Sequence, residues 1–437
     1  MTWENVKSVL LTILVGTSLL LTLAIWNYQP QYDVLDKENI INDSTKIRSG
    51  SKESVKSIIQ PKHIIFHQNN RIFSLAQLSE ENELYKEIRT WPLTDFQYRA
   101  KGTYERDSTI EVVFPTPVPI QTLVNTYTVK EKEKEDLPEL TVDRMLIQMS
   151  QQQSSSLVYF VSSDSEENIK AEIQNFDVYS NVEDYLVNPY GQVNYLAYEK
   201  NRKSPIYLPE GQVTLPMNTY PTRSINPDTF INVLFSNPNL VRPNSSNIGE
   251  EYYSDGTTRL RIYENETMME FINPAETEYT LMDRSGLIRQ SLEFVNDHNG
   301  WTDNYNIYHL SQNQNYIRYR LIKEGYPVFD DENRTLIEQR WKNQEIFEYQ
   351  RALIQLQPPF GSQEITLRSG SDVLAYLEEA WKNYPPYLIK DIAVGYEMKR
   401  TGSSAEVYTL EPAWFIKLND WQKITFDEGL MNQGGGR

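Results

Sequence analysis

Two histidines, His63 and His67, have the spacing that most resembles a metal site in this sequence. Four residues apart on a helix, they would share one face and could bind zinc. The run HIIFH is instead typical of a strand, in which positions 63, 65 and 67 also share a face. No carboxylate follows at a motif spacing, and the chain has only 4 His. We therefore predict that both are strand residues and not metal ligands.

Acidic residues form a second candidate, because Asp164, Glu166 and Glu167 directly follow a strand-like run. Carboxylates on such loops often act as the acid and the base of a hydrolase. A short helix expected over residues 166–176 explains them equally well, as caps that complement its N-terminal dipole. A hydrolase with an unfamiliar site stays as one hypothesis, to be tested by loss of activity on mutating Asp164 or Glu166.

Other signatures of catalysis are missing from the sequence. Ser254-Asp255-Gly256 resembles part of a catalytic tripeptide, but it is better explained as a turn before a strand. The chain has no Gly-x-Ser-x-Gly elbow and no Ser-x-x-Lys pair in a catalytic context. It also has no glycine-rich loop for a phosphate or a dinucleotide. We predict no catalytic residue, no metal, no cofactor and no enzymatic activity.

The first structural element that the sequence predicts is an apolar stretch at residues 8–29, SVLLTILVGTSLLLTLAIWNYQ. Its 22 residues carry no charge. As a helix they would rise about 33 Å, enough to cross a hydrocarbon core of about 30 Å. A cleaved signal peptide is the alternative, but its apolar region is shorter and ends in small residues, whereas Trp26 and Tyr28 are bulky interfacial aromatics. We predict an uncleaved transmembrane helix.

The orientation and a contact face of this span follow from its residues. Lys7 and the α-amino group lie on the short side, which predicts a cytoplasmic N-terminus at residues 1–7 and about 400 residues outside the cell. Ser8, Thr12 and Gly16 recur every four residues, and such rows of small residues let two membrane helices approach closely. We predict a partner-helix contact there, with ordinary span composition as the alternative.

The composition limits the partners of the rest of the chain. A net charge of −18 over 437 residues repels nucleic acid, so we predict no nucleic-acid partner. The absence of cysteine excludes disulfides, thiol catalysis and Cys-based zinc sites, and it fits the wall side of a single-membrane bacterium. The 29 Tyr favour β-rich, half-exposed surfaces.

The segment pattern predicts an α+β fold, in which an N-terminal transmembrane helix precedes a multidomain extracellular region. A polar juxtamembrane spacer is expected at residues 30–60, and a boundary within the Pro-, Asn- and Gly-dense residues 188–227. The expected domains are an N-terminal α/β ectodomain at 61–205, a central α+β domain at 206–335 and a C-terminal α+β domain with a flexible tail at 336–437.

Local signals predict individual elements of these domains. HIIFH and RIFSL should pair as a hairpin around Gln68-Asn69-Asn70. A helix should begin at Leu78 with Ser79 as its cap, and the strand TIEVVF should be stopped by Pro115, Pro117 and Pro119.

A weak internal repeat is expected in the second half of the chain. Residues 279–329 and 364–419 both have a pattern of strand, helix and two strands, and Ser371 should cap the second helix. These β-α-β-β units suggest a duplication on the pattern alone.

Four segments resemble the YycH (WalH) family, and the resemblance covers essentially the whole chain: LLTILVGTSLLLTLAIWNYQPQYD, PKHIIFHQNNRIFSL, YSDGTTRLRIY and LEPAWFIKL. It implies a Gram-positive, single-span membrane regulator that acts with its paralogue YycI on the essential sensor histidine kinase YycG (WalK), which controls cell-wall genes. It also implies that the C-terminal helix-hairpin units share their fold with YycI. The family brings no established catalytic residues.

A second class of function remains open beside the regulator. The chain would then be a wall-facing protein that binds a peptide or a glycan, with membrane lipid contacting only the span. A pocket lined by exposed Tyr and Trp side chains would favour this alternative.

Overall fold

The computed structural model divides into two units, Met1–Asp43 and Ser44–Arg437. The residues that it describes are 7, 14, 15, 17, 18, 45–98, 106–134, 137–149, 155–163, 165, 167–174, 176–200, 204–245, 250–263, 266–274, 279–380, 386–402 and 407–426.

The predicted membrane span at 8–29 lies outside the described residues, apart from four helical ones, Leu14, Val15, Thr17 and Ser18. The contact residues Ser8, Thr12 and Gly16 lie outside them as well. Within the described part of the chain, no helix is both long enough and apolar enough to cross a membrane. The span, its orientation and its contact face therefore stay predictions.

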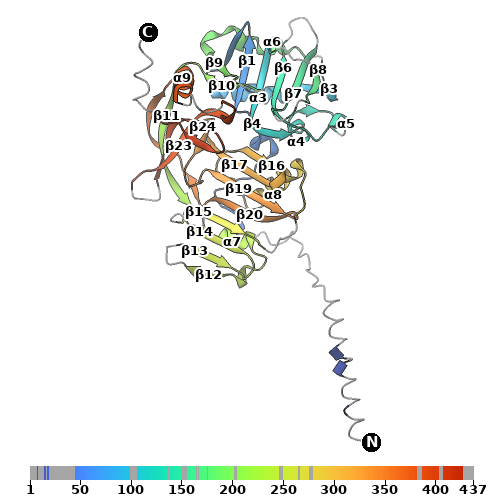
Figure 1. The fold of residues 1–437 in the computed structure, drawn as a ribbon, viewed down its shortest axis with the longest axis vertical. Coiled ribbons are helices and arrows are strands. Elements are labelled where there is room, and N and C mark those ends of the chain that lie inside the picture. The colour runs from blue at the N-terminus through green and yellow to red at the C-terminus, as the bar shows by residue number, and fades with distance from the viewer. Residues whose placement is uncertain are drawn as a thin grey trace. The chain divides into compact units, whose positions relative to one another are not determined.

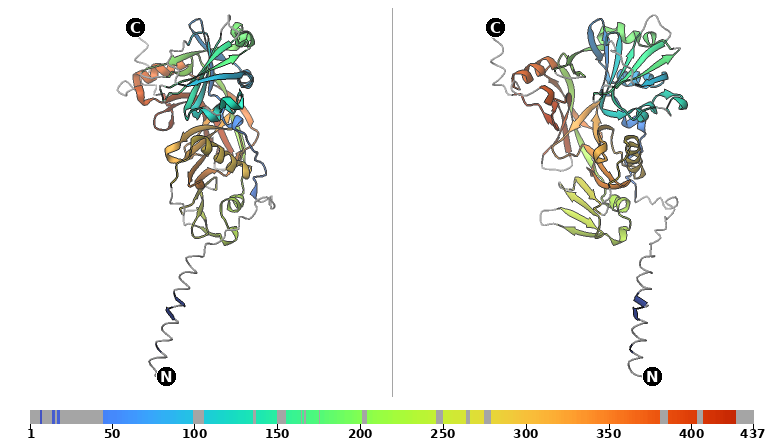
Figure 2. Two further views of the ribbon diagram at one scale, coloured as in Figure 1. Left: turned by 90° about the vertical axis from the view of Figure 1, so that its right-hand side faces the viewer. Right: turned by 45° about the vertical axis from the view of Figure 1, so that its right-hand side comes forward.

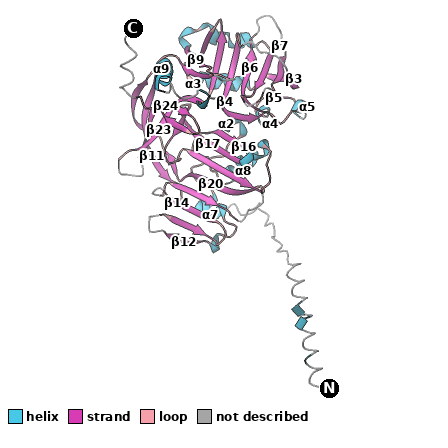
Figure 3. Cartoon of the chain, in the orientation of Figure 1, coloured by secondary structure: helices cyan, strands magenta, loops and turns pink. Residues whose placement is uncertain are grey.

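The second unit has a mixed α+β fold that is mostly sheet, as predicted (Figure 3). Its first half contains α2 (Val55–Ile58), β1 (His63–Gln68), β2 (Arg71–Leu75), α3 (Leu78–Ile88), β3 (Pro92–Tyr98), β4 (Thr109–Pro119), α4 (Ile120–Val124), β5 (Thr128–Val129), α5 (Glu131–Lys134), β6 (Thr141–Gln148), β7 (Ser155–Val161), β8 (Ile169–Gln174), α6 (Val178–Val187), the 3-10 helix η2 (Pro189–Gly191), β9 (Gln192–Tyr198) and β10 (Ile206–Pro209).

Ten described strands of this half form the first sheet, in the order β10-β9-β2-β1-β4-β6-β7-β8-β3-β5 (Figure 1). Neighbours pair antiparallel, except that β3 and β5 are parallel. The predicted hairpin is confirmed as β1 and β2. Asn69 and Asn70 form its two-residue turn with φ of 53° and 60°, a conformation that Asn tolerates better than most residues.

Two predictions in this half are wrong. Residues 166–176 contain no helix among those described, because β8 occupies Ile169–Gln174. Its sequence IKAEIQ alternates buried and partly buried residues, the period of a strand. The strand does not stop after TIEVVF either, since β4 continues through Pro115 and Pro117 and ends only at Pro119, the last of the three prolines. The register against β6 shifts between Val113 and Val118, so the prolines, which lack an N–H, lie in an irregular part of the ladder.

The second half contains β11 (Val213–Ser224), α7 (Asp228–Leu234), η3 (Pro238–Leu240), β12 (Arg242–Ser245), β13 (Glu251–Ser254), β14 (Arg259–Tyr263), β15 (Met268–Ile272), α8 (Arg284–Asp297), β16 (Tyr305–Ser311), η4 (Gln312–Gln314), β17 (Tyr316–Lys323), β18 (Tyr326–Phe329), β19 (Leu336–Lys342), β20 (Glu345–Ala352), β21 (Ile354–Leu356), β22 (Phe360–Leu367), α9 (Gly370–Ala380), η5 (Pro386–Leu388), β23 (Asp391–Arg400), β24 (Val407–Lys417) and β25 (Trp421–Lys423).

Fifteen described strands of this half form the second sheet. Its main path is β12-β13-β14-β15-β20-β19-β17-β18-β23-β24-β11-β21, with β16 on β17, β22 on β11 and β25 on β24. Figure 2 shows β12–β15 at the end of this sheet that lies farthest from the first sheet.

The predicted repeat is confirmed in its second copy, β22-α9-β23-β24, but not in its first. Tyr279–Met282 forms no strand before α8. The Met282 N–H donates to Asn315 Oδ1 at 3.0 Å and its carbonyl accepts from Gln312 Nε2 at 3.1 Å, so side chains satisfy this backbone where a neighbouring strand was expected.

Both predicted serine caps are wrong. Helix α3 is preceded by Gln77, which gives no side-chain cap, so Ser79 lies inside the first turn. At α9, Ser369 Oγ accepts from the Asp372 N–H at 3.1 Å, whereas Ser371 Oγ donates to the Glu210 carbonyl. In each case the helix begins before the serine that sequence spacing favoured.

One hydrophobic core runs through both sheets and includes Trp91, Trp301 and Trp414, each almost fully buried. Strand β16 of the second sheet packs directly on β4 of the first. Reciprocal hydrogen bonds between Gln60 and Asn306, at 3.2 and 2.9 Å, fasten the chain before β1 to β16. The two sheets therefore share one interior.

Candidate functional site

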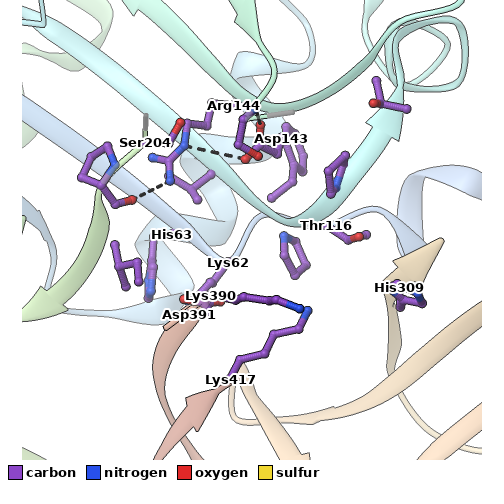
Figure 4. Close-up of a pocket in the computed structure, with 18 of the residues that line it drawn as sticks. Lys62, His63, Thr116, Asp143, Arg144, Ser204, His309, Lys390, Asp391 and Lys417 are labelled. Atoms are coloured by element: carbon purple, nitrogen blue, oxygen red, sulfur yellow. Dashed lines mark hydrogen bonds and ion pairs between the residues drawn. The ribbon is translucent and has the colours of Figure 1, made fainter. Parts of the chain in front are cut away.

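A cavity of about 490 Å³ lies between the two sheets, and we call it the interface cleft (Figure 4). The first sheet supplies one wall from β1, β4, β6 and the segment before β10, and β16, β23 and β24 supply the other. Its polar lining includes the residues labelled in Figure 4, which are Lys62, His63, Thr116, Asp143, Arg144, Ser204, His309, Lys390, Asp391 and Lys417.

An ion pair closes one side of the interface cleft. Lys62 Nζ lies 2.5 Å from Asp391 Oδ1, and the two side chains are 11% and 19% exposed. The Lys62 N–H also donates to the Val113 carbonyl at 2.6 Å. Lys62 directly precedes β1 and Asp391 begins β23, so this pair joins the first sheet to the second.

Behind the interface cleft lies a set of four buried polar side chains, which we call the buried quartet: Glu111, Arg144, His67 and Tyr207. The strand register places Glu111, Arg144 and His67 on one face of the first sheet. Arg144 forms an ion pair with Glu111 Oε1, while Glu111 Oε2 lies 3.0 Å from His67 Nε2 and accepts from Tyr207 Oη at 2.6 Å. Arg144 Nη2 also donates to the Pro205 carbonyl at 2.6 Å, which holds the segment before β10.

The partners of Glu111 keep its carboxylate ionised. Burial raises its pKa, but the hydrogen bond from His67, the charge of Arg144 and the hydroxyl of Tyr207 outweigh burial and bring the pKa to about 2. A carboxylate with this pKa is too weak a base to take a proton at neutral pH. The buried quartet therefore serves as an ion-pair network rather than as a proton-transfer site.

The two predicted strand histidines point to different surroundings. His67 belongs to the buried quartet, whereas His63 lines the interface cleft and meets Tyr195 edge to face at 5.5 Å between ring centroids. Burial, followed by the positive charges of Lys62 and Arg144, lowers the pKa of His63 well below its ordinary value. Among the described residues, no group of three or more His, Asp or Glu side chains could hold a metal ion.

The acidic cluster is described only at Glu167, whose N–H donates to Ser165 Oγ at 3.0 Å. Asp164 and Glu166 lie outside the described residues. Residues 254–256 form the predicted turn, between β13 and β14. There Asp255 Oδ1 accepts from the N–H groups of Thr257 and Thr258, at 2.9 and 2.8 Å, so this carboxylate is occupied by its own loop.

A second cavity of about 450 Å³ lies beside the interface cleft and has a more aromatic wall. Tyr308 and Trp414, which line it, are 4% and 2% exposed, while Tyr195 and Tyr326 are partly exposed. Glu81 of α3 lines it too and accepts from the Ile64 N–H at 2.7 Å. Burial outweighs that hydrogen bond and raises the pKa of Glu81 to about 7. This cavity could serve the peptide- or glycan-binding alternative. However, the rings of Tyr308 and Trp414 are almost fully buried and offer a ligand little surface.

Sequence reasoning missed most of these residues, since they come from strands far apart in the chain. One signal was present: Glu111 and Arg144 interrupt the apolar runs TIEVVF and TVDRMLIQ. Charged residues inside such strands are rarely buried unless they are paired. Each of the two therefore indicated a buried partner, but the sequence did not show which residue that partner is.

Two family models match the chain, YycH protein, N-terminal domain, at residues 4–188, and YycH protein, C-terminal domain, at residues 203–431. The chain is 22% identical to the Two-component system WalR/WalK regulatory protein YycH of Bacillus subtilis (strain 168), over 95% of each chain. It is also similar to the crystal structure of YycH from Bacillus subtilis, with a TM-score of 0.70, 18% identity and coverage of 88% of this chain and 100% of that one. The chain belongs to the YycH family, which confirms the resemblance.

Proposed function

We propose that this member of the YycH family regulates the sensor histidine kinase of a WalR/WalK two-component system and is not an enzyme. The observation that carries the proposal is the match along 95% of both chains to a relative whose name describes that role. The two family models reach from residue 4 to residue 431, so the likeness is not confined to one module. The ionised and fully partnered Glu111 agrees with a binding protein better than with a hydrolase.

In the finer form of the proposal, the chain is anchored by a helix at 8–29, with residues 1–7 in the cytoplasm and the unit Ser44–Arg437 outside. The three ectodomain segments 61–205, 206–335 and 336–437 are part of this proposal. The chain acts on YycG (WalK) together with YycI, through contacts of the membrane helix and of the extracellular domains.

The physical basis is differential packing in the membrane. A partner helix shifts the kinase only if it packs better against one signalling state than against the other. Small residues at Ser8, Thr12 and Gly16 would allow the close approach that makes such packing selective. Coupling of this kind is typically about 1–3 kcal/mol, which changes the ratio of the two states by about 5- to 150-fold.

The experiment replaces residues 8–29 with a poly-Leu span and measures kinase output with a reporter of its target genes. We expect regulation to be lost while the chain stays in the membrane fraction. Gly16→Ile should reproduce the loss. Ser18→Ile, about 200° around the same helix, is the matched control and should leave regulation intact. Unchanged regulation with the poly-Leu span would refute the helix-contact mechanism.

Crosslinking in membranes would identify which protein contacts the span. Cysteines placed singly at 12, 16 and 20 are the only thiols in the chain, since the sequence has 0 Cys. Crosslinks to a kinase span or to another single-span protein, strongest at 12 and 16, would support the contact face. No crosslink at any position would leave the span as an anchor and assign regulation to the extracellular domains.

A further inference from the structure

A third cavity, of about 430 Å³, adjoins the interface cleft and shares His309, Lys390 and Lys417 with it. We call it the basic pocket. Its charged lining is five cations and one carboxylate: Arg318, Arg320, Arg340, Lys390, Lys417 and Asp420. The whole chain carries −18, so positive charge is concentrated here against the trend of the molecule.

Two of the five cations have carboxylate partners that shape the walls. Arg318 Nε lies 2.8 Å from Glu338 Oε1, and Arg340 Nη1 lies 2.8 Å from Glu348 Oε2. These pairs run along the sheet between β17, β19 and β20. They leave Arg320 and Lys417 as the cations whose charge the pocket wall compensates least.

Lys417 of β24 is held among other cations. No carboxylate of the described residues lies within 4.0 Å of its Nζ, which sits 5.9 Å from the ring centroid of Trp421. Burial lowers its pKa, Asp391 raises it, and the nearby charges of Arg320, Lys62 and Lys390 lower it further. An anion between these side chains would remove that repulsion.

Arg320 of β17 is buried, with 4% of its surface exposed. Its Nη1 donates to the Val328 carbonyl at 2.9 Å, and its guanidinium stacks 4.3 Å from the Phe329 ring centroid. Burial, and to a smaller extent the charge of Arg318, bring its pKa down to about 10, against the opposing effects of Tyr308, Asp420 and Asp330.

Three buried donors around the basic pocket have no hydrogen-bond partner among the described residues: Arg320 Nε, Tyr308 Oη and Trp421 Nε1. A buried donor without an acceptor is unfavourable, and an acceptor oxygen that reached it would relieve that cost. Each can donate to the same kind of ligand, one rich in acceptor oxygens. His309, whose pKa is lowered by burial and by Lys417 and Arg318, adds a ring beside them.

We propose that the basic pocket binds a small oxyanion of the phosphate class. Phosphate offers several acceptor oxygens and more than one negative charge, which suits the guanidinium and ammonium groups that line this cavity. The acidic surface of the rest of the chain repels long polyanions, so the ligand is a phosphate or a phosphate monoester rather than a phosphodiester polymer. This inference does not rest on the proposed regulation of a kinase.

The first experiment measures thermal unfolding of the full chain in detergent with increasing inorganic phosphate, at constant ionic strength set with chloride. A ligand that binds only the folded state raises Tm in proportion to the logarithm of its concentration. We expect phosphate to raise Tm and chloride alone to leave it unchanged. An equal Tm at every phosphate concentration would overturn the proposal.

Single-residue variants test whether phosphate binds in the basic pocket. Lys417→Gln should weaken phosphate binding by at least about tenfold, measured by calorimetry, while the unliganded chain stays as stable as wild type or gains stability. Lys390→Gln, at an exposed position of the same wall, should also weaken binding and serves if the first variant fails to fold. Lys86→Gln on α3 removes the same charge away from the pocket and is the control. Equal weakening in all three variants would mean a nonspecific charge effect and contradict the site.

Two further ligands test the class. Glycerol 3-phosphate should bind about as tightly as inorganic phosphate, because its phosphate keeps three free oxygens. A short phosphodiester oligomer should bind at least about tenfold more weakly at low salt, since the acidic chain repels it. Tighter binding of the oligomer would overturn the assignment to a small ligand.

Discussion

The buried quartet lies in the first sheet and the basic pocket in the second. Their positively charged side chains have opposite surroundings. In the first sheet, Arg144 meets a fully buried carboxylate, and Glu111 accepts from two further donors. In the second sheet, Arg320 and Lys417 have no described carboxylate within ion-pair distance. A paired interior charge holds strands in place, whereas an uncompensated one at a cavity favours binding of an anion. The comparison can be tested residue by residue.

Glu111→Gln should have the largest effect, because it removes the closer carboxylate partner of the buried Arg144 and leaves only the 3.9 Å pair with Asp143. Breaking one side of a buried ion pair typically costs about 3–5 kcal/mol, and we expect a loss of that size in the free energy of unfolding by urea. Glu199→Gln removes the carboxylate of an exposed pair with Arg106 and should cost about 0–1 kcal/mol. A loss below that of the control would mean that the buried quartet is not a stabilising network.

The pH dependence of the same variant should be the next largest effect. The folded pKa of Glu111 is about 2 against an ordinary 4.5, so its ionised form stabilises the fold above pH 4.5 and this contribution is lost as pH falls toward 2. The difference in unfolding free energy between wild type and Glu111→Gln should therefore shrink by about 3 kcal/mol over that window. Urea titrations at intervals of pH would measure it, and a constant difference would disprove the assignment.

Glu81 is a partly buried acid for which the described residues offer no ion-pair partner. Its folded pKa of about 7 lies above the ordinary 4.5, so wild type loses stability as pH rises from 4.5 through 7. Glu81→Gln keeps an acceptor for the Ile64 N–H and cannot ionise. The variant should be more stable than wild type by about 1–3 kcal/mol above pH 7 and similar to it near pH 4.5. Glu83→Gln, exposed on the same helix, should show no such divergence in thermal unfolding.

Lys417→Gln should have the smallest effect on stability, and of opposite sign to Glu111→Gln. Its lowered pKa means that the charged form is disfavoured in the fold, so removing the charge should raise the free energy of unfolding at neutral pH. As pH rises toward the ordinary value of 10.5, wild type should recover this difference. A clear destabilisation at neutral pH would mean that Lys417 has a compensating partner.

The sequence predicted elements that depend on neighbouring residues. Asn69 and Asn70 form the expected hairpin turn, and α8 and the β22-α9-β23-β24 unit lie where their patterns placed them. The prediction was wrong where a local signal competed with pairing to a distant strand. Acidic residues suggested a helix over 166–176, yet the alternation in IKAEIQ joined that segment to β3 and β7 as β8.

The clefts could not be predicted, because their residues converge only through the sheets. Lys62 and Asp391 are 329 positions apart and still share an ion pair. The total of −18 gave no hint that Arg318, Arg320 and Lys417 gather at one cavity, since a net charge averages over the surface. The three-domain division and the membrane contact face remain predictions.

The strand pairing of β11 limits how early this part of the chain can fold during synthesis. Its partners β21, β22 and β24 all come from the last part of the sequence, and Thr219 meets Thr409 across 190 positions. During synthesis from the N-terminus, β11 must wait for β21 and β22 at residues 354–367, and its edge toward β24 stays unpaired until β24 has emerged as well. A premature stop shortly before residue 407 would thus cost more than a hairpin: it would leave β11 and β23 without β24 and expose them to aggregation.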